Sequence, residues 1–483
     1  MKAKSGWATR ARIDWIRLGF PCLLLGTLAC GGGGSDLSAV NSGPPTAPTI
    51  AVPAAGTVGF QVIATVQGAS ASFGYNWTIA PGTFKGGSNT ATGNSVTFTP
   101  TGAGTVTLAC VAIAGNVVAS PPATQNVTIT PPSTSAGSFQ PAGTLLQGRQ
   151  GMAAALLSSD TILVTGGSAT PGGAALNSTE IFTISSGLSR VGQTLTTVRA
   201  GHAITSLSAT QFLITGGTGT LGTSVPAVPA SATSSEIYDS GTGGFSLAGN
   251  MANGRSGHTA TPITSPAGVL VVGGVQGGTW VGPAEWFDPV AHTFSGEGSV
   301  NLAPGHTATT LPGGTVLLVS HSSSGSPYAT IYDPNSGTFL PTANQPAFAR
   351  EGHQALLLAS PQRVLILGGA SGGVPLASAE WYDPVTQRFT TIGVPMASPR
   401  RDFGAAILQN GQVLLLGGTA DGSTAVATSE LFDPVAVSFT PAAPLGAPRR
   451  GPTVITAGGT VLVLGGSNET QGVVPAVEAF TTP

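Results

Sequence analysis

The chain has 483 residues, of which only 7% are charged, and its formal net charge is −2. This balance excludes the strongly basic surface that recognises nucleic acid or anionic membranes. Gly (71 residues) and Pro (37 residues) are abundant, and this composition favours strands and turns over helices. We therefore expect an all-β protein.

Residues 1–29 have the pattern of an export signal. Basic residues, among them Lys2 and Arg17, precede an apolar stretch that runs from Leu18 to Ala29. The stretch is too short to span a bilayer but has the length of a secretory signal. We therefore expect the protein to leave the cytoplasm.

The segment "GTLAC", which ends at Cys30, resembles the signal of a bacterial lipoprotein. The resemblance implies a lipid anchor at Cys30, and Gly31 in place of Asp implies sorting to the outer membrane. The Gly- and Ser-rich residues 30–43 would then tether the folded part to the membrane. The alternative is an ordinary secretory signal that is cut near Ala29 and leaves Cys30 free.

Residues 44–131 are predicted to form a small β-sandwich, because segments such as "FQVIATVQG" and "GTVTLACVAIAG" are typical of its strands. Trp77 followed by the strand around Cys110 resembles bacterial Ig-like or PKD-like modules, which implies a spacer or an adhesive contact. The other two cysteines lie in the first thirty residues, so we expect Cys110 to be a small buried side chain without a disulfide. Residues 132–136 are the expected linker.

A repeat runs through residues 137–483. Apolar segments recur at intervals of about 50 residues, a period that indicates an array of one supersecondary unit. All but one end in a glycine pair, and their last residues are Gly167, Gly217, Gly274, His321, Gly369, Gly418 and Gly466. These segments are apolar at consecutive positions, as expected for strands that neighbouring sheets cover on both faces.

Two further landmarks keep step with the glycine pairs. An entry of the type "R-x-G-H" precedes each apolar segment, and an acid that usually opens "E-x-Y/F-D-P" follows it. The entries start at Arg149, Arg199, Arg255, Ala303, Arg350, Arg400 and Arg449, and the later positions are Glu180, Glu236, Glu285, Thr330, Glu380, Glu430 and Glu478. With the strand after the Asp-Pro turn, each unit has four short strands, which predicts a β-propeller.

These motifs resemble the kelch family, and the glycine pair with "E-x-Y-D-P" resembles its galactose-oxidase-like branch. The resemblance covers residues 137–483 and implies seven blades. The last unit ends at "VEAFTTP" without a fourth strand, whereas residues 137–143 ("GSFQPAG") match "GTFLPTA" from Gly337. We therefore expect residues 137–143 to complete the last blade, which would remove exposed sheet edges.

The recurrent Arg and Glu are expected to pair. In an antiparallel four-stranded blade, the entry and the connection between the second and third strands lie on one face, which we call the top face. The fourth unit has Ala303 and Thr330 at the two positions, so both charges are lost together. A lone buried charge would be costly, and we interpret the pair as a structural clamp; the alternative is a ring of acids that binds a ligand.

Four histidines occupy the entry position and are the candidates for a metal site. They are His202, His258, His306 and His353. Imidazole suits zinc or copper, but recurrence beside the structural Arg favours packing and hydrogen bonding, so no cofactor is predicted. Copper-radical oxidases of the family use a tyrosine cross-linked to cysteine, and the repeat region contains no cysteine.

The remaining candidates are residues of the top-face connections that depart from the repeat. Exposed aromatic residues beside polar groups suit stacking on a sugar or a peptide. The candidates for ligand binding are Trp280, His321, Tyr328, Phe348, Arg401, Asp402 and Arg450.

The sequence therefore predicts an exported, lipid-anchored lipoprotein of the bacterial outer membrane that binds without catalysis. Its propeller would hold a glycan or protein partner on the top face, and no nucleic-acid partner is expected. The alternative is an extracytoplasmic carbohydrate-active enzyme with its site at the mouth of the propeller channel. Neither a serine-nucleophile motif nor a zinc or phosphate-loop motif is present.

Overall fold

The structure is a computed structural model that describes residues 46–58, 62–114, 117–130, 137–219 and 232–482. These residues form strands, turns and irregular segments, and none of them lies in a helix. The predicted all-β class is confirmed.

The N-terminal described part forms two sheets around one core. The first sheet has the order β1-β3-β6, and the second has the order β2-β9-β7-β4-β5, with β8 paired to β7. The strands are β1 (Thr49–Ala51), β2 (Ala55–Thr57), β3 (Val62–Gln67), β4 (Gly74–Ala80), β5 (Thr90–Thr92), β6 (Ser95–Phe98), β7 (Gly104–Ala114), β8 (Val117–Val118) and β9 (Ala123–Thr130).

Trp77 and Cys110 are cross-strand partners on β4 and β7, and both are buried in this core. The indole Nε1 of Trp77 donates to the carbonyl oxygen of Gly93 at 2.8 Å, which satisfies its polar edge. Cys110 is a free cysteine, and burial raises the pKa of its thiol to about 11. The prediction that Cys110 is a buried side chain without a disulfide is confirmed.

From residue 138 onward, the described residues form one eight-stranded sheet and five four-stranded sheets, besides short hairpins. The eight-stranded sheet contains, in order, β11 (Ala153–Ser158), β12 (Thr161–Thr165), β13 (Thr179–Thr183), β14 (Leu188–Val191), β10 (Ser138–Thr144), β43 (Ala476–Thr481), β40 (Thr460–Leu464) and β39 (Thr453–Ala457). A single parallel pairing, between Thr144 of β10 and Leu188 of β14, joins its two halves.

The four-stranded sheets are antiparallel, and each follows chain order. They are β15 (Ala203–Ser206), β16 (Gln211–Thr215), β17 (Ser235–Asp239) and β18 (Gly244–Leu247); β19 (Thr259–Thr264), β20 (Ala267–Val272), β23 (Pro283–Asp288) and β24 (Thr293–Ser299); β25 (Thr307–Thr310), β26 (Val316–His321), β27 (Pro327–Asp333) and β28 (Thr338–Pro341); β29 (Gln354–Ala359), β30 (Gln362–Leu367), β33 (Ala379–Asp383) and β34 (Arg388–Ile392); and β35 (Gly404–Ile407), β36 (Val413–Leu416), β37 (Ser429–Asp433) and β38 (Ser438–Ala442).

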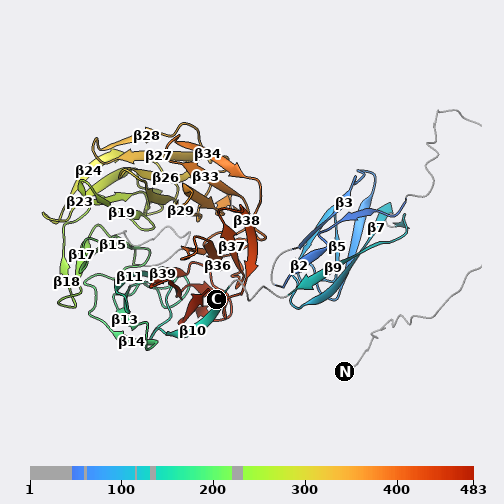
Figure 1. Cartoon of the computed structure of the whole chain (residues 1–483), viewed down its shortest axis with the longest axis horizontal. Coiled ribbons are helices and arrows are strands. Elements are labelled where there is room, and N and C mark those ends of the chain that lie inside the picture. The colour runs from blue at the N-terminus through green and yellow to red at the C-terminus, as the bar shows by residue number, and fades with distance from the viewer. Residues whose placement is uncertain (1–45, 59–61, 115–116, 131–136, 220–231, 483) are drawn as a thin grey trace, which may run out of the picture. The chain divides into compact units, whose positions relative to one another are not determined.

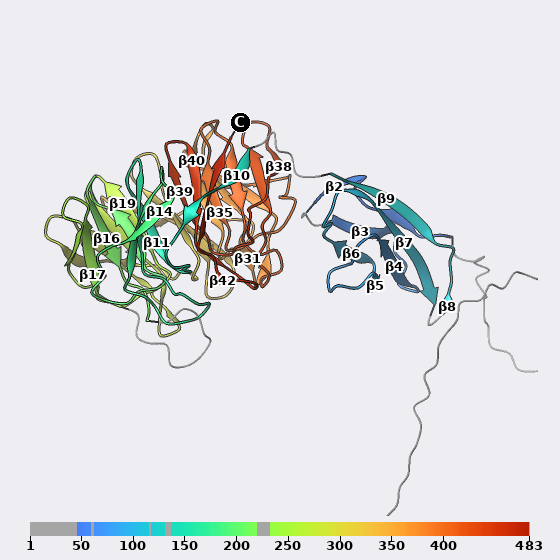
Figure 2. The same cartoon turned by 90° about the horizontal axis from the view of Figure 1, so that it is seen from below.

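Three small hairpins follow glycine pairs. They are β21 (Val275–Gln276) with β22 (Thr279–Trp280), β31 (Ala370–Ser371) with β32 (Val374–Pro375), and β41 (Ser467–Asn468) with β42 (Gly472–Val473). β31 and β42 lie at the same end of the sheets (Figure 2). This end is the top face defined above, because the hairpins lie in the connection that follows the second strand of a unit.

The sheets are arranged around a common centre, with their first strands innermost (Figure 1). Each first strand contacts the next in the cycle β11, β15, β19, β25, β29, β35, β39, and β39 contacts β11. The cycle places the described top-face ends of these sheets around one axis.

The second strands are buried because a sheet lies on each side of them. In β12, Ile162 and Val164 pack with residues of β40, whereas Leu163 packs with residues of β16. All three side chains are fully buried. This packing explains why the second strands are apolar at consecutive positions.

β10 lies antiparallel to β43, with Phe139 opposite Phe480. The pairing that the sequence predicts between the segment before the first unit and the end of the chain is therefore present. It brings residues more than 300 positions apart into one sheet and supplies the outer strand that the last unit lacks.

Candidate functional site

The recurrent Arg and Glu residues form buried ion pairs. In each pair, Nη2 of the arginine lies within 3.0 Å of Oε1 of the glutamate, and each side chain is at most 9% exposed. The pairs are Arg149–Glu180, Arg199–Glu236, Arg255–Glu285, Arg350–Glu380, Arg400–Glu430 and Arg449–Glu478. The predicted clamp is confirmed, and these charges serve the scaffold.

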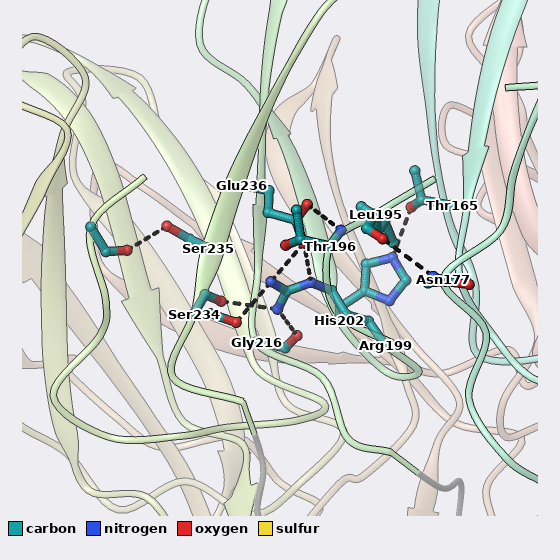
Figure 3. Close-up of polar contacts among 11 residues, drawn as sticks. Thr165, Asn177, Leu195, Thr196, Arg199, His202, Gly216, Ser234, Ser235 and Glu236 are labelled. Carbon is teal, nitrogen blue, oxygen red and sulfur yellow. Dashed lines mark hydrogen bonds and ion pairs between the residues drawn. The ribbon is translucent and has the colours of Figure 1, made fainter. Parts of the chain in front are cut away.

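Arg199 shows what one clamp holds together (Figure 3). Its Nη1 donates to the carbonyl oxygens of Gly216 at 2.7 Å and Ser234 at 2.9 Å, while its Nε and Nη2 donate to Glu236. The second carboxylate oxygen of Glu236 accepts a hydrogen bond from the N–H of Thr196 at 2.8 Å. One guanidinium thus joins the entry, the end of β16 and the start of β17.

The fourth unit replaces the clamp with neutral contacts. Ala303 and Thr330 are buried, and the Thr330 hydroxyl donates to the carbonyl oxygen of Leu340 at 2.8 Å. Burial lowers the pKa of Arg199, and its partner Glu236 opposes this shift. A guanidinium in this environment needs its carboxylate, which explains why the fourth unit lacks both charges.

The entry histidines connect adjacent sheets. Each imidazole Nε2 lies 2.8–3.1 Å from a threonine hydroxyl of the preceding sheet, the pairs being His202–Thr165, His258–Thr215, His306–Thr259 and His353–Thr307. Desolvation lowers the pKa of His202 to about 3 and that of His306 to about 4, so these rings are neutral at pH 7. Within the described part of the chain, no group of three or more His, Cys, Asp or Glu residues could hold a metal ion.

The glycine pair of one unit packs against the entry of the next unit. Gly216 has a φ of 63°, and a Cβ there would collide with the carbonyl oxygen of Arg255 and with the imidazole of His258. The N–H of Gly217 donates to the same Arg255 carbonyl at 2.8 Å. These contacts explain why the glycine pairs and the entries recur together.

The second residue after each clamp position lies on a ring at the channel mouth. Six of these residues are glycines with φ between 59° and 77°: Gly151, Gly201, Gly257, Gly305, Gly352 and Gly451. The seventh is Asp402, which has a φ of 52°. A residue with a side chain therefore occupies a left-handed position that favours glycine, and such strain is concentrated at functional sites.

Asp402 lies at the edge of a cavity of about 630 Å³. The cavity is also lined by His306, His353, Gln354 and Arg450. Its volume is within the range of small-molecule sites, which is roughly 300–1,000 Å³. The side chain of Asp402 is 41% exposed and can accept hydrogen bonds from a ligand.

An ionic network extends from Asp402 along the rim. Nε of Arg401 lies 3.1 Å from Oδ2 of Asp402, and its Nη1 lies 3.2 Å from Oε1 of Glu351. Oε2 of Glu351 lies 3.8 Å from Nε2 of His321, and the rings of His321 and Trp280 meet edge to face with centroids 5.7 Å apart. Four predicted site residues are therefore connected, with Glu351 in the middle.

The other three predicted site residues lie in different surroundings. Arg450 lines the cavity. The ring of Phe348 lies 5.3 Å from the guanidinium carbon of Arg350, and Tyr328 packs against the buried residues of β20 and β26. Phe348 and Tyr328 thus contact the scaffold, whereas charged side chains form the rim.

Glu351 was not among the predicted site residues, although the sequence carries a signal for it. It directly follows the clamp arginine, as Arg401 and Arg450 do in the next two units. The other residues at this repeat position are Gln150, Ala200, Ser256 and Pro304. Comparison of the units at this one position would have shown a polar arc made of Glu351, Arg401, Arg450 and Gln150.

The export signal (residues 1–29) and the lipidation site Cys30 lie outside the described residues and stay predictions. A helix that is long and apolar enough to span a membrane does not occur among the residues that the structure describes.

These sheets around a common centre define an all-β propeller protein with a cavity lined by residues of several units. Among solved structures, it is similar to a fungal alcohol oxidase of the AA5 family in complex with copper, with a TM-score of 0.53. The sequences are 17% identical, and the match covers 72% of this chain and 77% of that chain. The likeness confirms the galactose-oxidase-like propeller fold and extends no further than the fold. No protein-family model matches the sequence, and no match to a curated protein was found.

Proposed function

We propose that the protein is an exported carbohydrate-binding lipoprotein whose ligand occupies the cavity at the mouth of a seven-bladed kelch propeller. In this proposal, residues 1–29 are the signal, residues 30–43 the tether, residues 44–131 an Ig-like stalk and residues 137–483 the propeller. The six Arg–Glu clamps, the neutral fourth unit and the closed cycle of inner strands support seven blades.

The observation that supports a binding function is the presence of Asp402 at a position where the other units have glycine. Glycine occupies the six equivalent positions, so the fold does not require the carboxylate of Asp402, which is free to bind a ligand. Its carboxylate, Gln354 and Arg450 supply acceptors and donors around one cavity, which is the combination that sugar hydroxyls require. An open cavity of about 630 Å³ has the size of a small ligand such as a glycan, which it suits better than the broad surface of a protein partner.

A glycan array tests this function. The mature protein should bind a defined set of glycans, and Asp402→Gly should weaken that binding at least about tenfold, the effect of one lost charge-assisted hydrogen bond. The variant should unfold at the same temperature as the parent or higher, because glycine suits the position. Binding that survives Asp402→Gly, or a protein that binds no glycan, would contradict the proposal.

The second candidate is a carbohydrate-active enzyme that uses the same cavity. An acid that departs from the repeat and lines a cavity is also what an enzyme would need, and Asp402 meets that description. Incubation of bound glycans with the protein distinguishes the two. Release of shortened or oxidised products that stops in Asp402→Asn would favour the enzyme, whereas unchanged glycans favour binding alone.

Anchoring to the outer membrane is proposed from Cys30 and tested separately. Cells that express the protein and grow with radiolabelled palmitate should incorporate label into the parent protein. Cys30→Ser should abolish labelling and release the protein from the membrane fraction. Equal labelling of both proteins would contradict lipidation at Cys30.

A further inference from the structure

Arg450 is a guanidinium at the cavity without a carboxylate partner. Its Nη1 donates to the carbonyl oxygen of Ser423 at 2.9 Å, and its Nε donates to the hydroxyl of Ser467 at 3.5 Å. No carboxylate of the described residues lies within ion-pair distance of it, whereas Arg401 contacts both Glu351 and Asp402. Arg450 is thus held in place while part of its donor capacity stays free.

The scaffold does not require a charge at this position. The backbone of Arg450 exchanges two hydrogen bonds with Ser467, at 2.9 and 3.0 Å. In the first unit, Gln150 and Ser168 make the same exchange at 3.1 and 2.9 Å. The fold therefore needs only the main chain here, and a guanidinium side chain remains available for a ligand.

Arg450 and Asp402 are neighbours at this cavity. Both line the cavity, and the N–H of Gly451, the residue after Arg450, donates to the carbonyl oxygen of Asp402 at 2.7 Å. A guanidinium binds a carboxylate through parallel hydrogen bonds, whereas the carboxylate of Asp402 accepts from hydroxyl groups and repels a second carboxylate. The two side chains therefore select different groups at neighbouring points of one ligand.

We propose that the ligand is an acidic carbohydrate of the uronic acid type, with its carboxylate on Arg450 and its hydroxyls on Asp402. This inference rests on the proposed carbohydrate-binding function and specifies its ligand. A neutral sugar could accept hydrogen bonds from Arg450 but would not balance its charge, whereas a uronic acid offers a carboxylate to Arg450 and hydroxyls to Asp402.

The test uses matched carbohydrates and matched variants of the full mature protein. The carbohydrates are oligogalacturonate and the same oligosaccharide with its carboxylates methyl-esterified, measured by isothermal titration calorimetry alongside an array of neutral, carboxylated and sulfated glycans. Arg450→Gln removes the charge and introduces the residue that the first unit has at this position. Arg388→Gln on the outer strand β34 is the control, because it changes the net charge equally at an exposed site.

The acidic oligosaccharide should bind, and Arg450→Gln should weaken its binding at least about tenfold, as expected for a lost charge-assisted pair. Arg388→Gln should have no effect, and the methyl ester should bind weakly and equally to all three proteins. Binding of neutral glycans alone, lost in Asp402→Gly but kept in Arg450→Gln, overturns the acidic ligand while the proposed function stands. Binding of sulfated but not carboxylated glycans also overturns it, and binding of no glycan overturns both proposals.

Discussion

The clamp between Arg350 and Glu380 allows a quantitative test of the scaffold. Arg350 donates five hydrogen bonds: two to Glu380, two to carbonyl oxygens of Gly368 and Ser378, and one to the Ser378 hydroxyl. Its side chain is fully buried, and that of Glu380 is 1% exposed. Removal of either partner leaves a buried charge without compensation, which costs about 3–5 kcal/mol. We therefore expect Arg350→Met and Glu380→Gln each to lower the free energy of unfolding by this amount.

The double variant should lose less than the sum of the two single losses, because it contains no uncompensated charge. A coupling energy of about 2 kcal/mol or more is expected, within the range of contacting residues in one network. Urea unfolding monitored by tryptophan fluorescence, to which Trp381 on β33 beside Glu380 contributes, gives the free energy of unfolding of the parent and the three variants.

The control pair is Arg363 and Asp383, whose charged atoms lie 3.8 Å apart with side chains 42% and 30% exposed. An exposed pair contributes less than about 1 kcal/mol, so Arg363→Met and Asp383→Asn should have small effects. Single losses in the clamp that add within about 0.5 kcal/mol would refute the pairing argument.

Three further predictions concern the ring, the histidines and the glycine pair. Asp402→Gly should keep or raise the free energy of unfolding, by up to about 1 kcal/mol, because it relieves a left-handed residue; a clear loss in urea unfolding would show that Asp402 serves the fold. Unfolded histidine takes up protons below pH 6.5, whereas the lowered pKa values of His202 (about 3) and His306 (about 4) delay protonation in the folded protein. The free energy of unfolding should therefore fall as the pH decreases from 6.5 towards 4, by up to about 1.4 kcal/mol per pH unit for each imidazole. An equally steep fall in His202→Gln would show that the protonation of His202 does not cause the pH dependence. Gly216→Ala should destabilise the protein by several kcal/mol more than Gly243→Ala, because both glycines have positive φ but a Cβ has free space only at Gly243; equal melting temperatures would show that the close contact at Gly216 is unimportant.

The cavity residues show where prediction from the sequence ends. Asp402 stands out in the sequence because it breaks a repeat, and Arg450 because it is a charged residue at a position that varies between units; the structure places both at one cavity. Tyr328 and Phe348 also break the repeat, yet they pack against β20 and β26 and against Arg350. A departure from a repeat marks a position as free to vary, but the direction of the side chain depends on the neighbouring sheet.

The sequence by itself determined the propeller repeat, the Arg–Glu clamps and the pairing of residues 138–144 with the end of the chain. The repeat and the clamps depend on contacts that recur at a constant spacing, so the same residues reappear in all units but the fourth, and the closing segment is recognised because it matches the outer strand of another unit. Only the tertiary structure decided that Glu351, Arg401 and Asp402 form one network and that Arg450 lines the same cavity as Asp402 without a carboxylate partner. The physical reason is that closure of the ring brings together residues of separate units, about 50 positions apart, whose contacts no local pattern records.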